Sequence, residues 1–138
     1  MTPTVTKEEM SELATEGVGK FERGAELYIR PIFWGQDGWI APNPDSTQFA
    51  MLVYDSPMPA PTGFGACLST RRRPAPDQAM TDAKASCLYP NAGRALKEAA
   101  VRGYDNAIIL DPNGNVAEFA TSNLFMVKDG VAHTPIPN

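Results

Sequence analysis

The sequence predicts an α+β fold with two lobes, an α/β-like first lobe and a strand-rich second lobe. Three observations predict it. A helix with a strong N-terminal cap precedes two β-rich runs, a proline-rich stretch interrupts the chain, and short β-rich runs surround one further helix in the remainder. We therefore place the first lobe at residues 1–54, an interdomain linker at 55–64 and the second lobe at 65–138.

The first lobe is expected to contain one helix and two strands. Thr6 and Glu9 have the spacing of a capping box and precede apolar residues at helical spacing, so a helix is predicted at about 6–17. A strand is predicted within ELYIRPIFWG (26–35), although Pro31 cannot donate a ladder hydrogen bond. The second strand, TQFAMLVYD (47–55), is mostly apolar, which predicts burial on both of its faces.

The linker and the second lobe follow from turn residues and β-formers. Three prolines stiffen the linker, and FGACLST (64–70) is typical of a strand. We expect RRRPAPDQAMTD (71–82) to be a loop and 91–103 to be a helix whose left-handed C-terminal cap is Gly103. Two hairpins are predicted beyond it, at 106–120 and at 123–135, the latter with its turn at KDG.

The charge and the cysteines exclude several kinds of partner. A net charge of -4 argues against nucleic acid and anionic membranes, which attract clustered positive charge. The arginine run 71–73 is expected to be mostly a solvated loop face with room for one arginine held inside. Cys67, Cys87 and His133 lack metal-ligand spacing, so no metal site and a reduced, cytoplasmic setting are expected. No membrane span or export signal is apparent.

Glu118 is the least expected residue of the second lobe. It follows a tight turn and stands among Val116, Ala117, Phe119 and Ala120 in a predicted strand. A buried carboxylate without a partner costs several kcal/mol, roughly, so it reaches water or meets a positive charge. We expect that its partner does not come from the protein.

Four segments of the sequence, in this order, resemble motifs of the class IV aminotransferases, the fold-type IV enzymes that use pyridoxal 5'-phosphate. They are AKASCLY, KEAAVRGYDNAIILD, NGNVAEFATSNLFMVKDG and TP. The resemblance is specific over about residues 84–135 and continues more weakly upstream through YIRPIFWG and RRRPAPDQ. Within the class, Tyr89 and Arg30 resemble most closely the branched-chain amino acid aminotransferases. The fold that the resemblance implies is a partial fold-type IV aminotransferase.

The resemblance implies a role for each of five residues. Lys84 would form the internal Schiff base with the cofactor aldehyde and then move the proton between substrate and cofactor. Glu118 would face the pyridine nitrogen and favour its protonated form. Tyr89 would hydrogen-bond the ring phenolate oxygen, Asn123 would fix the geometry of that segment or of Tyr89, and Arg30 would bind the substrate carboxylate.

Each of these residues also has a structural explanation when it is taken alone. Lys84 fits a surface lysine, and Tyr89 fits a half-buried core aromatic. Glu118 fits a strand-edge carboxylate that faces water, and Asn123 fits a turn former. Arg30 fits an arginine paired with a structural acid. The case for function therefore depends on the residues occurring together.

The leading hypothesis is transamination of branched-chain amino acids with 2-oxoglutarate by a homodimer whose sites lie near the subunit interface. Other activities of the class stay open: D-amino acid aminotransferase, (R)-selective amine transaminase and aminodeoxychorismate lyase. Family members also carry an N-terminal arginine and C-terminal glycine turns that hold the cofactor phosphate, and neither is found in this sequence. We therefore expect an internal segment of a longer aminotransferase, and a non-catalytic structural piece is the remaining alternative.

Overall fold

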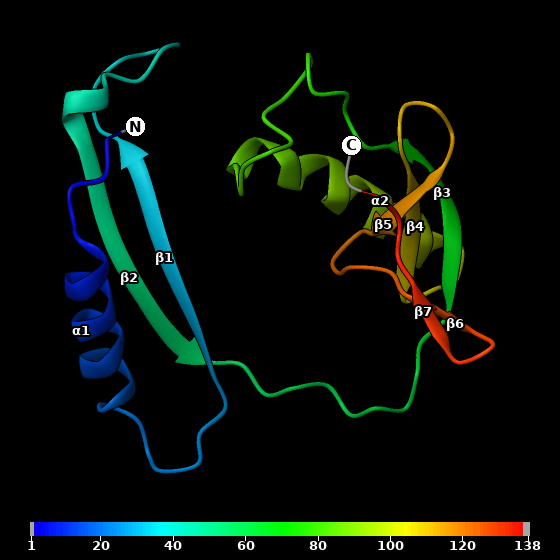
Figure 1. Cartoon of the computed structure of the whole chain (residues 1–138), viewed down its shortest axis with the longest axis horizontal. Coiled ribbons are helices and arrows are strands. Elements are labelled where there is room, and N and C mark those ends of the chain that lie inside the picture. The colour runs from blue at the N-terminus through cyan, green and yellow to red at the C-terminus, as the bar shows by residue number, and fades with distance from the viewer. Residues whose placement is uncertain (1, 137–138) are drawn as a thin grey trace. The chain divides into compact units, whose positions relative to one another are not determined.

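The computed structural model describes residues 2–136 (Figure 1). The chain forms two compact units, Met1–Pro61 and Thr62–Asn138. The boundary between them falls inside the proline-rich segment. Within the described residues, no helix has both the length and the apolar character needed to cross a membrane.

The first unit begins with helix α1 (Lys7–Val18), which lies within one residue of the predicted helix. The predicted capping box is present. The Thr6 N–H donates to Glu9 Oε2 at 2.7 Å, and the Glu9 N–H donates to Thr6 Oγ1 at 3.2 Å. Two N–H groups that the first turn would leave without a partner are thereby satisfied, which fixes where the helix begins.

Strands β1 (Leu27–Gly35) and β2 (Thr47–Asp55) form an antiparallel two-stranded sheet, and the 3-10 helix η1 (Pro44–Ser46) precedes β2. Pro31 pairs with Met51 in this register. Proline is tolerated there because both strands of a two-stranded sheet are edge strands. The two predicted strands of the first lobe are therefore confirmed.

Helix α1 lies along β2 and covers one face of this sheet (Figure 1). The approach is close at Gly17, where an added Cβ would lie 2.6 Å from Val53 Cγ2. Because side chains alternate between the faces of a strand, Tyr28 and Tyr54, which pair in the register, lie on the opposite face from Val53. Their rings stack with centroids 5.5 Å apart.

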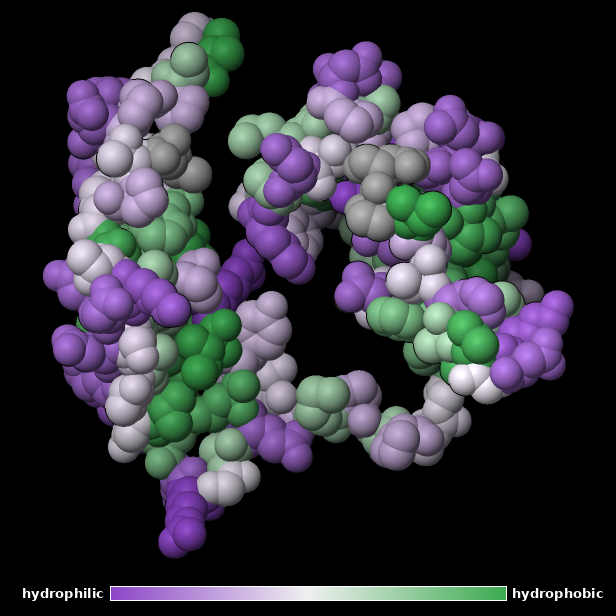
Figure 2. Space-filling view, viewed as in Figure 1, coloured by the Kyte–Doolittle hydropathy of each residue, from purple (hydrophilic) through white to green (hydrophobic). Residues whose placement is uncertain are grey.

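The expected burial of β2 on both faces is wrong. Thr47 is its only buried residue, and the two stacked tyrosine side chains are 51% and 42% exposed. A single helix packed on a two-stranded sheet covers only one face, so the apolar residues of the other face stay at the surface of the described unit. Figure 2 shows hydrophobic residues at the surface of this unit.

The second unit is a three-stranded sheet with one helix and a separate hairpin. Its elements are β3 (Ala66–Arg72), η2 (Ser86–Leu88), α2 (Tyr89–Val101), β4 (Asn106–Leu110), β5 (Val116–Phe119), β6 (Met126–Lys128) and β7 (Val131–His133). The sheet order is β3-β4-β5, with β3 and β4 parallel and β4 and β5 antiparallel. Strands β6 and β7 pair only with each other in the described residues, around a turn at Asp129 and Gly130, where the sequence predicts it.

Two boundaries in this unit differ from the prediction. Strand β3 extends to Arg72, so the first two arginines of the run 71–73 belong to the strand rather than to a loop. Helix α2 begins two residues early, at Tyr89, because Pro90 occupies the first turn, where proline's missing N–H costs nothing. The helix ends as predicted at a left-handed Gly103 with φ 78°, and the Tyr104 N–H donates to the Ala99 carbonyl at 3.0 Å.

The core of the second unit consists of small side chains. Ala95 and Ala99 of α2 pack against Cys67 of β3 and against Ala107 and Ile109 of β4. Alanine side chains at the contact allow the helix to lie close to the sheet. The helix is thereby held across the two parallel strands, and its first residue lies near the strand ends where the site forms.

Glu98 fastens α2 to the edge of β3. Its carboxylate accepts hydrogen bonds from the Thr70 N–H at 3.0 Å and from Ser69 Oγ at 2.9 Å. The bond from the Thr70 backbone contributes most, and together with the Ser69 hydroxyl it holds the pKa of the Glu98 carboxyl below its ordinary value. A carboxyl with a lowered pKa in the folded state stabilises the fold above its unfolded pKa and loses that effect as the pH falls.

We predict that Glu98→Gln lowers the melting temperature at pH 7, because the amide cannot accept these bonds as a carboxylate does. The difference from wild type should shrink as the pH falls below 4.5, the ordinary pKa, and should be lost once the pH is below the lowered pKa of the folded state, where the wild-type carboxyl is protonated. Thermal unfolding followed by circular dichroism measures this. Glu12→Gln on the exposed side of α1 is the matched control and should melt like wild type; a pH-independent difference for Glu98→Gln would contradict the prediction.

Candidate functional site

The candidate site lies at the carboxyl ends of the parallel strands β3 and β4. The Arg73 N–H donates to the Leu110 carbonyl at 2.8 Å, so the chain stays beside β4 for one residue beyond β3. From there a long loop leads to η2 and α2, while β4 turns directly into β5. In open sheets with parallel strands, ligands bind outside the carboxyl ends of those strands.

The turn between β4 and β5 is fixed by side chains. Asp111 accepts from the Asn115 N–H at 2.8 Å and from Asn115 Nδ2 at 3.0 Å, and Gly114 adopts a φ of 94° that favours glycine. Arg72 Nη1 donates to the Pro112 carbonyl at 2.7 Å. These contacts set the register in which Glu118 of β5 pairs with Ile109 of β4.

Glu118 is bound by an arginine of the same unit. Arg73 Nη1 donates to Glu118 Oε1 at 2.7 Å, and Arg73 Nη2 donates to the Thr81 carbonyl at 3.1 Å. About a third of each charged side chain is exposed, 32% for Arg73 and 35% for Glu118. Among the described residues, Arg73 is the one hydrogen-bonding partner of this carboxylate, and Oε2 accepts no hydrogen bond from them.

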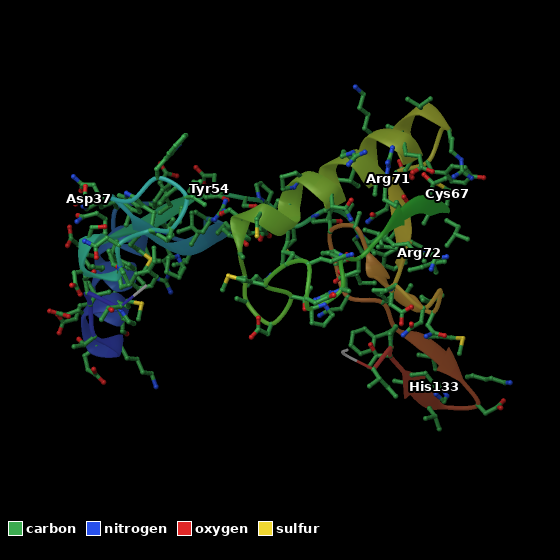
Figure 3. The ribbon with its side chains drawn as sticks, turned by 90° about the horizontal axis from the view of Figure 1, so that it is seen from above. Asp37, Tyr54, Cys67, Arg71, Arg72 and His133 are labelled. Atoms are coloured by element: carbon green, nitrogen blue, oxygen red, sulfur yellow. The ribbon has the colours of Figure 1, made fainter. Side chains whose placement is uncertain are left out.

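The expectation that the partner of Glu118 does not come from the protein is therefore wrong. The arginine run accounts for the difference, because its three members do different things. Arg71 is exposed, Arg72 holds the turn carbonyl and Arg73 reaches Glu118. Figure 3 shows Arg71 and Arg72 on opposite sides of β3, as neighbours on a strand must be. The expectation of one arginine held inside fits Arg73.

Two hollows in the second unit are lined in part by Arg73. The first is a cavity of about 140 Å³ lined by Glu118, Asn123 and Thr81, together with residues of the β4–β5 turn and of 134–136. The second is an open groove of about 520 Å³ whose lining includes Gln78, Cys87 and Asn91. Ligand pockets usually measure roughly 300–1,000 Å³, so the groove alone reaches that size.

The structure brings together some of the residues singled out in the sequence. Glu118 and Asn123 line the same cavity. Lys84 is exposed in the loop between β3 and η2, three residues after Thr81, and Tyr89 is 53% exposed as the first residue of α2. Neither side chain lines the two hollows. Arg30 lies exposed on β1 of the first unit, where it pairs in register with Leu52.

Two contacts of the site were not predicted from the sequence: the pairing of Arg73 with Glu118 and the bond from Arg73 to the Thr81 carbonyl. A signal for Arg73 was present, because Pro74 cannot donate a ladder hydrogen bond and so favours a strand end near Arg73. Nothing in the sequence marked Thr81, since it contributes a backbone carbonyl, which every residue has. Among the described residues, no three His, Cys, Asp or Glu side chains are grouped as a metal site.

The family model of the class IV aminotransferases matches residues 1–138. The chain therefore belongs to this family, and the predicted fold class, a partial fold-type IV aminotransferase of the α+β class, is confirmed.

Two solved structures and one curated relative show what the chain is similar to. A Brucella abortus aminotransferase bound to pyridoxal phosphate is 44% identical with a TM-score of 0.93, over 99% of this chain and 50% of that one. The Escherichia coli branched-chain amino acid aminotransferase is 33% identical with a TM-score of 0.84, over 97% and 45%. A probable branched-chain-amino-acid aminotransferase of Rickettsia typhi is 38% identical over 114 residues, 80% of this chain and 40% of that protein. The chain thus spans half or less of the length of these proteins.

Pyridoxal phosphate is the cofactor of this family. The chemistry of Glu118 suits the ring end of that cofactor, and the roles of Lys84 and Tyr89 at it stay predictions. Glu118 has one oxygen held by Arg73 and the other available as an acceptor for a protonated ring nitrogen. Lys84 is exposed and carries a primary amine, which is the group that an aldehyde requires, and Tyr89 is 53% exposed.

We predict that Glu118→Gln costs about 1 kcal/mol of stability in the protein without cofactor, since it removes a charge-assisted bond and leaves the Arg73 guanidinium half-buried without its counter-charge; the partial exposure keeps the figure low. Urea denaturation at pH 7 measures it. Asp77→Asn, which removes a carboxylate from the exposed loop, is the matched control and should change stability little. Equal midpoints for Glu118→Gln and wild type would show that the pair does not stabilise this unit.

Proposed function

We propose that the protein is a pyridoxal-phosphate-dependent aminotransferase acting on branched-chain amino acids with 2-oxoglutarate, with Lys84 as the cofactor lysine. The observation that carries the proposal is the state of Glu118. Its carboxylate is held at one oxygen by Arg73 at 2.7 Å, lines a cavity at the strand ends, and offers its second oxygen. The similarity to branched-chain aminotransferases over most of the chain supports the reaction class.

Lys84 is proposed to perform two tasks with one amine. Its amine would hold the cofactor aldehyde covalently and, once the amino acid has displaced it, would carry the proton to and from the substrate α-carbon. Its exposed position in a loop of the second unit suits both tasks, because the amine must reach the aldehyde and then swing toward the substrate. The amine must be neutral to do either.

Glu118 is proposed to accept a hydrogen bond from the ring nitrogen at Oε2. When bound, the cofactor supplies an electron sink for the carbanion left after α-proton removal. The carboxylate would keep the ring nitrogen protonated, because a negative charge favours the cationic form of a neighbouring base. Arg73 prevents the carboxylate from turning away, since its guanidinium occupies Oε1.

Tyr89 and Asn123 are proposed to orient the ring. The Tyr89 hydroxyl, exposed at the first residue of α2, would donate to the ring phenolate oxygen. Asn123 lines the same cavity as Glu118, which supports a role for its amide in fixing the segment that follows β5. Both roles concern geometry rather than proton transfer.

Arg30 is proposed to bind a substrate carboxylate. The planar guanidinium can hold a carboxylate with two parallel bonds, which suits the distal carboxylate of glutamate and 2-oxoglutarate. Arg30 lies on the face of the β1–β2 sheet that also carries Tyr28 and Tyr54, and α1 does not cover that face. Three side chains suited to a substrate pocket are therefore on one surface.

We also propose a cytoplasmic homodimer. Cys67 and Cys87 form no disulfide, as expected in a reducing compartment. Exposed apolar residues of the first unit, among them Trp34 at 44% and Tyr28 at 51%, offer a surface of the kind that subunit contacts cover. Sedimentation velocity would give the oligomeric state directly.

Borohydride labelling tests the cofactor assignment. Pyridoxal phosphate is added, the protein is reduced, and tryptic peptides are mapped by mass spectrometry. We expect the reduced adduct on Lys84 and not on Lys97, an exposed lysine of α2 that serves as the internal control. Labelling spread equally over surface lysines, or an adduct absent from Lys84, would overturn the proposal.

Kinetics of two variants test the division of roles. Lys84→Ala should abolish transamination while the protein stays folded, because the covalent attachment and the proton carrier are lost together. Glu118→Gln should retain cofactor but slow α-proton removal roughly 10²-fold, which corresponds to about 3 kcal/mol of transition-state stabilisation. Single-turnover spectra with leucine measure both. A Lys84→Ala protein with wild-type turnover would exclude this lysine.

The substrate assignment is tested by comparing leucine, D-alanine and aminodeoxychorismate as substrates. The proposal expects turnover with leucine, isoleucine and valine. Turnover of D-alanine or aminodeoxychorismate alone would assign another activity of the same family. A protein that takes up no cofactor on Lys84 and turns over none of the three would indicate a structural role.

A further inference from the structure

We propose that Arg73 is a positioning residue that sets the Glu118 carboxylate and the Lys84 loop at the same time. The inference rests on the proposed function for the identities of Lys84 and Glu118 and adds a residue to it. One guanidinium bonds to both segments: Nη1 donates to Glu118 Oε1 at 2.7 Å, and Nη2 donates to the Thr81 carbonyl at 3.1 Å.

The two acceptors belong to parts of the chain that are far apart in sequence. Glu118 is on β5, whereas Thr81 is in the loop that carries Lys84 three residues later. The backbone of Arg73 is itself anchored, because its N–H donates to the Leu110 carbonyl of β4 at 2.8 Å. The guanidinium therefore connects the loop and the acid to the middle strand of the sheet.

The loop has few other ties of this kind. Among the described residues, the backbone N–H groups of 74–85 that bond to backbone carbonyls bond within the loop itself, as Gln78 N–H does to the Ala75 carbonyl at 2.9 Å. Lys84 itself is exposed. The bond from Arg73 to the Thr81 carbonyl consequently limits how often this part of the loop moves away from the end of the sheet. It thereby sets where the Lys84 amine lies relative to Glu118.

The fork geometry of arginine is needed for this task. A guanidinium presents donors in two directions from one rigid plane, so it can hold two acceptors at once. A lysine ammonium in its place keeps the positive charge beside Glu118, but its donors share one nitrogen atom and cannot reach the Thr81 carbonyl at the same time. Arg73→Lys should therefore preserve the orientation of the acid and release the loop, whereas Arg73→Met loses both.

The rate of tryptic cleavage after Lys84, in the protein without cofactor, measures how often the loop that carries Lys84 opens. Trypsin does not cleave a bond that precedes a proline, and Pro74 follows Arg73. Replacing Arg73 by lysine or methionine therefore neither adds nor removes a cleavage site at the bond between residues 73 and 74. We expect cleavage after Lys84 to be about tenfold faster in Arg73→Met and Arg73→Lys, as expected when a charge-assisted hydrogen bond that limits local opening is lost. Arg71→Met, which removes an exposed neighbour, is the matched control and should be cleaved after Lys84 at the wild-type rate.

Turnover with pyridoxal phosphate measures how the Arg73 substitutions affect the function of the Glu118 carboxylate. It also distinguishes a positioning role of Arg73 from an effect on the stability of the fold alone. Arg73→Met should lower kcat tenfold or more with little change in the KM for the amino donor, because misplacement by about 1 Å can cost up to 10²-fold. Arg73→Lys should recover part of that kcat while its Lys84 loop stays susceptible to trypsin. A purely structural arginine would change kcat and cleavage in parallel with the melting temperature.

The outcomes separate this inference from the proposed function. Wild-type cleavage rates in both Arg73 variants would overturn the inference even if Lys84 binds the cofactor. No cofactor on Lys84 in the wild type would overturn the proposed function, and the cleavage rates would still decide whether Arg73 holds the loop. If Arg73→Met fails to fold, Arg73→Lys decides: recovery of kcat with fast cleavage supports the inference, and wild-type cleavage contradicts it.

Discussion

The ion pair between Arg73 and Glu118 is the constraint on which the site depends. Glu118 Oε1 is 2.7 Å from Arg73 Nη1, at the point where the parallel strands β3 and β4 end. The pair compensates a carboxylate that is two-thirds covered by protein, which would otherwise be costly. It also occupies Oε1, so that Oε2 is the oxygen to which no described residue donates a hydrogen bond.

Several features of the fold serve to hold this pair in place. The small core residues Ala95 and Ala99 bring α2 against the sheet, and Glu98 fastens the same helix to the edge of β3. Because α2 follows the loop that carries Lys84, its position limits where that loop can lie. Arg72 holds the turn that sets the register of β5, and with it the position of Glu118.

Much of the fold could be predicted from the sequence, since local signals determine it. The capping box at Thr6, the left-handed Gly103 and the KDG turn each act within a few residues and are found where expected. Burial of β2 could not be predicted this way, because it depends on how many layers cover a strand. The partner of Glu118 could not be predicted for a similar reason. Arg73 is 45 residues away in the sequence, and the two residues meet only because β3, β4 and β5 pair in one sheet.

The central claim is that Lys84 and Glu118 hold opposite ends of one pyridoxal ring. A crystal structure of the protein with pyridoxal phosphate tests it most directly. The account predicts continuous density from Lys84 Nζ to the ring, with the ring nitrogen about 2.9 Å from Glu118 Oε2 and Arg73 still on Oε1. A ring attached to another lysine, or one whose nitrogen faces water with Glu118 bound to Arg73 alone, would contradict it.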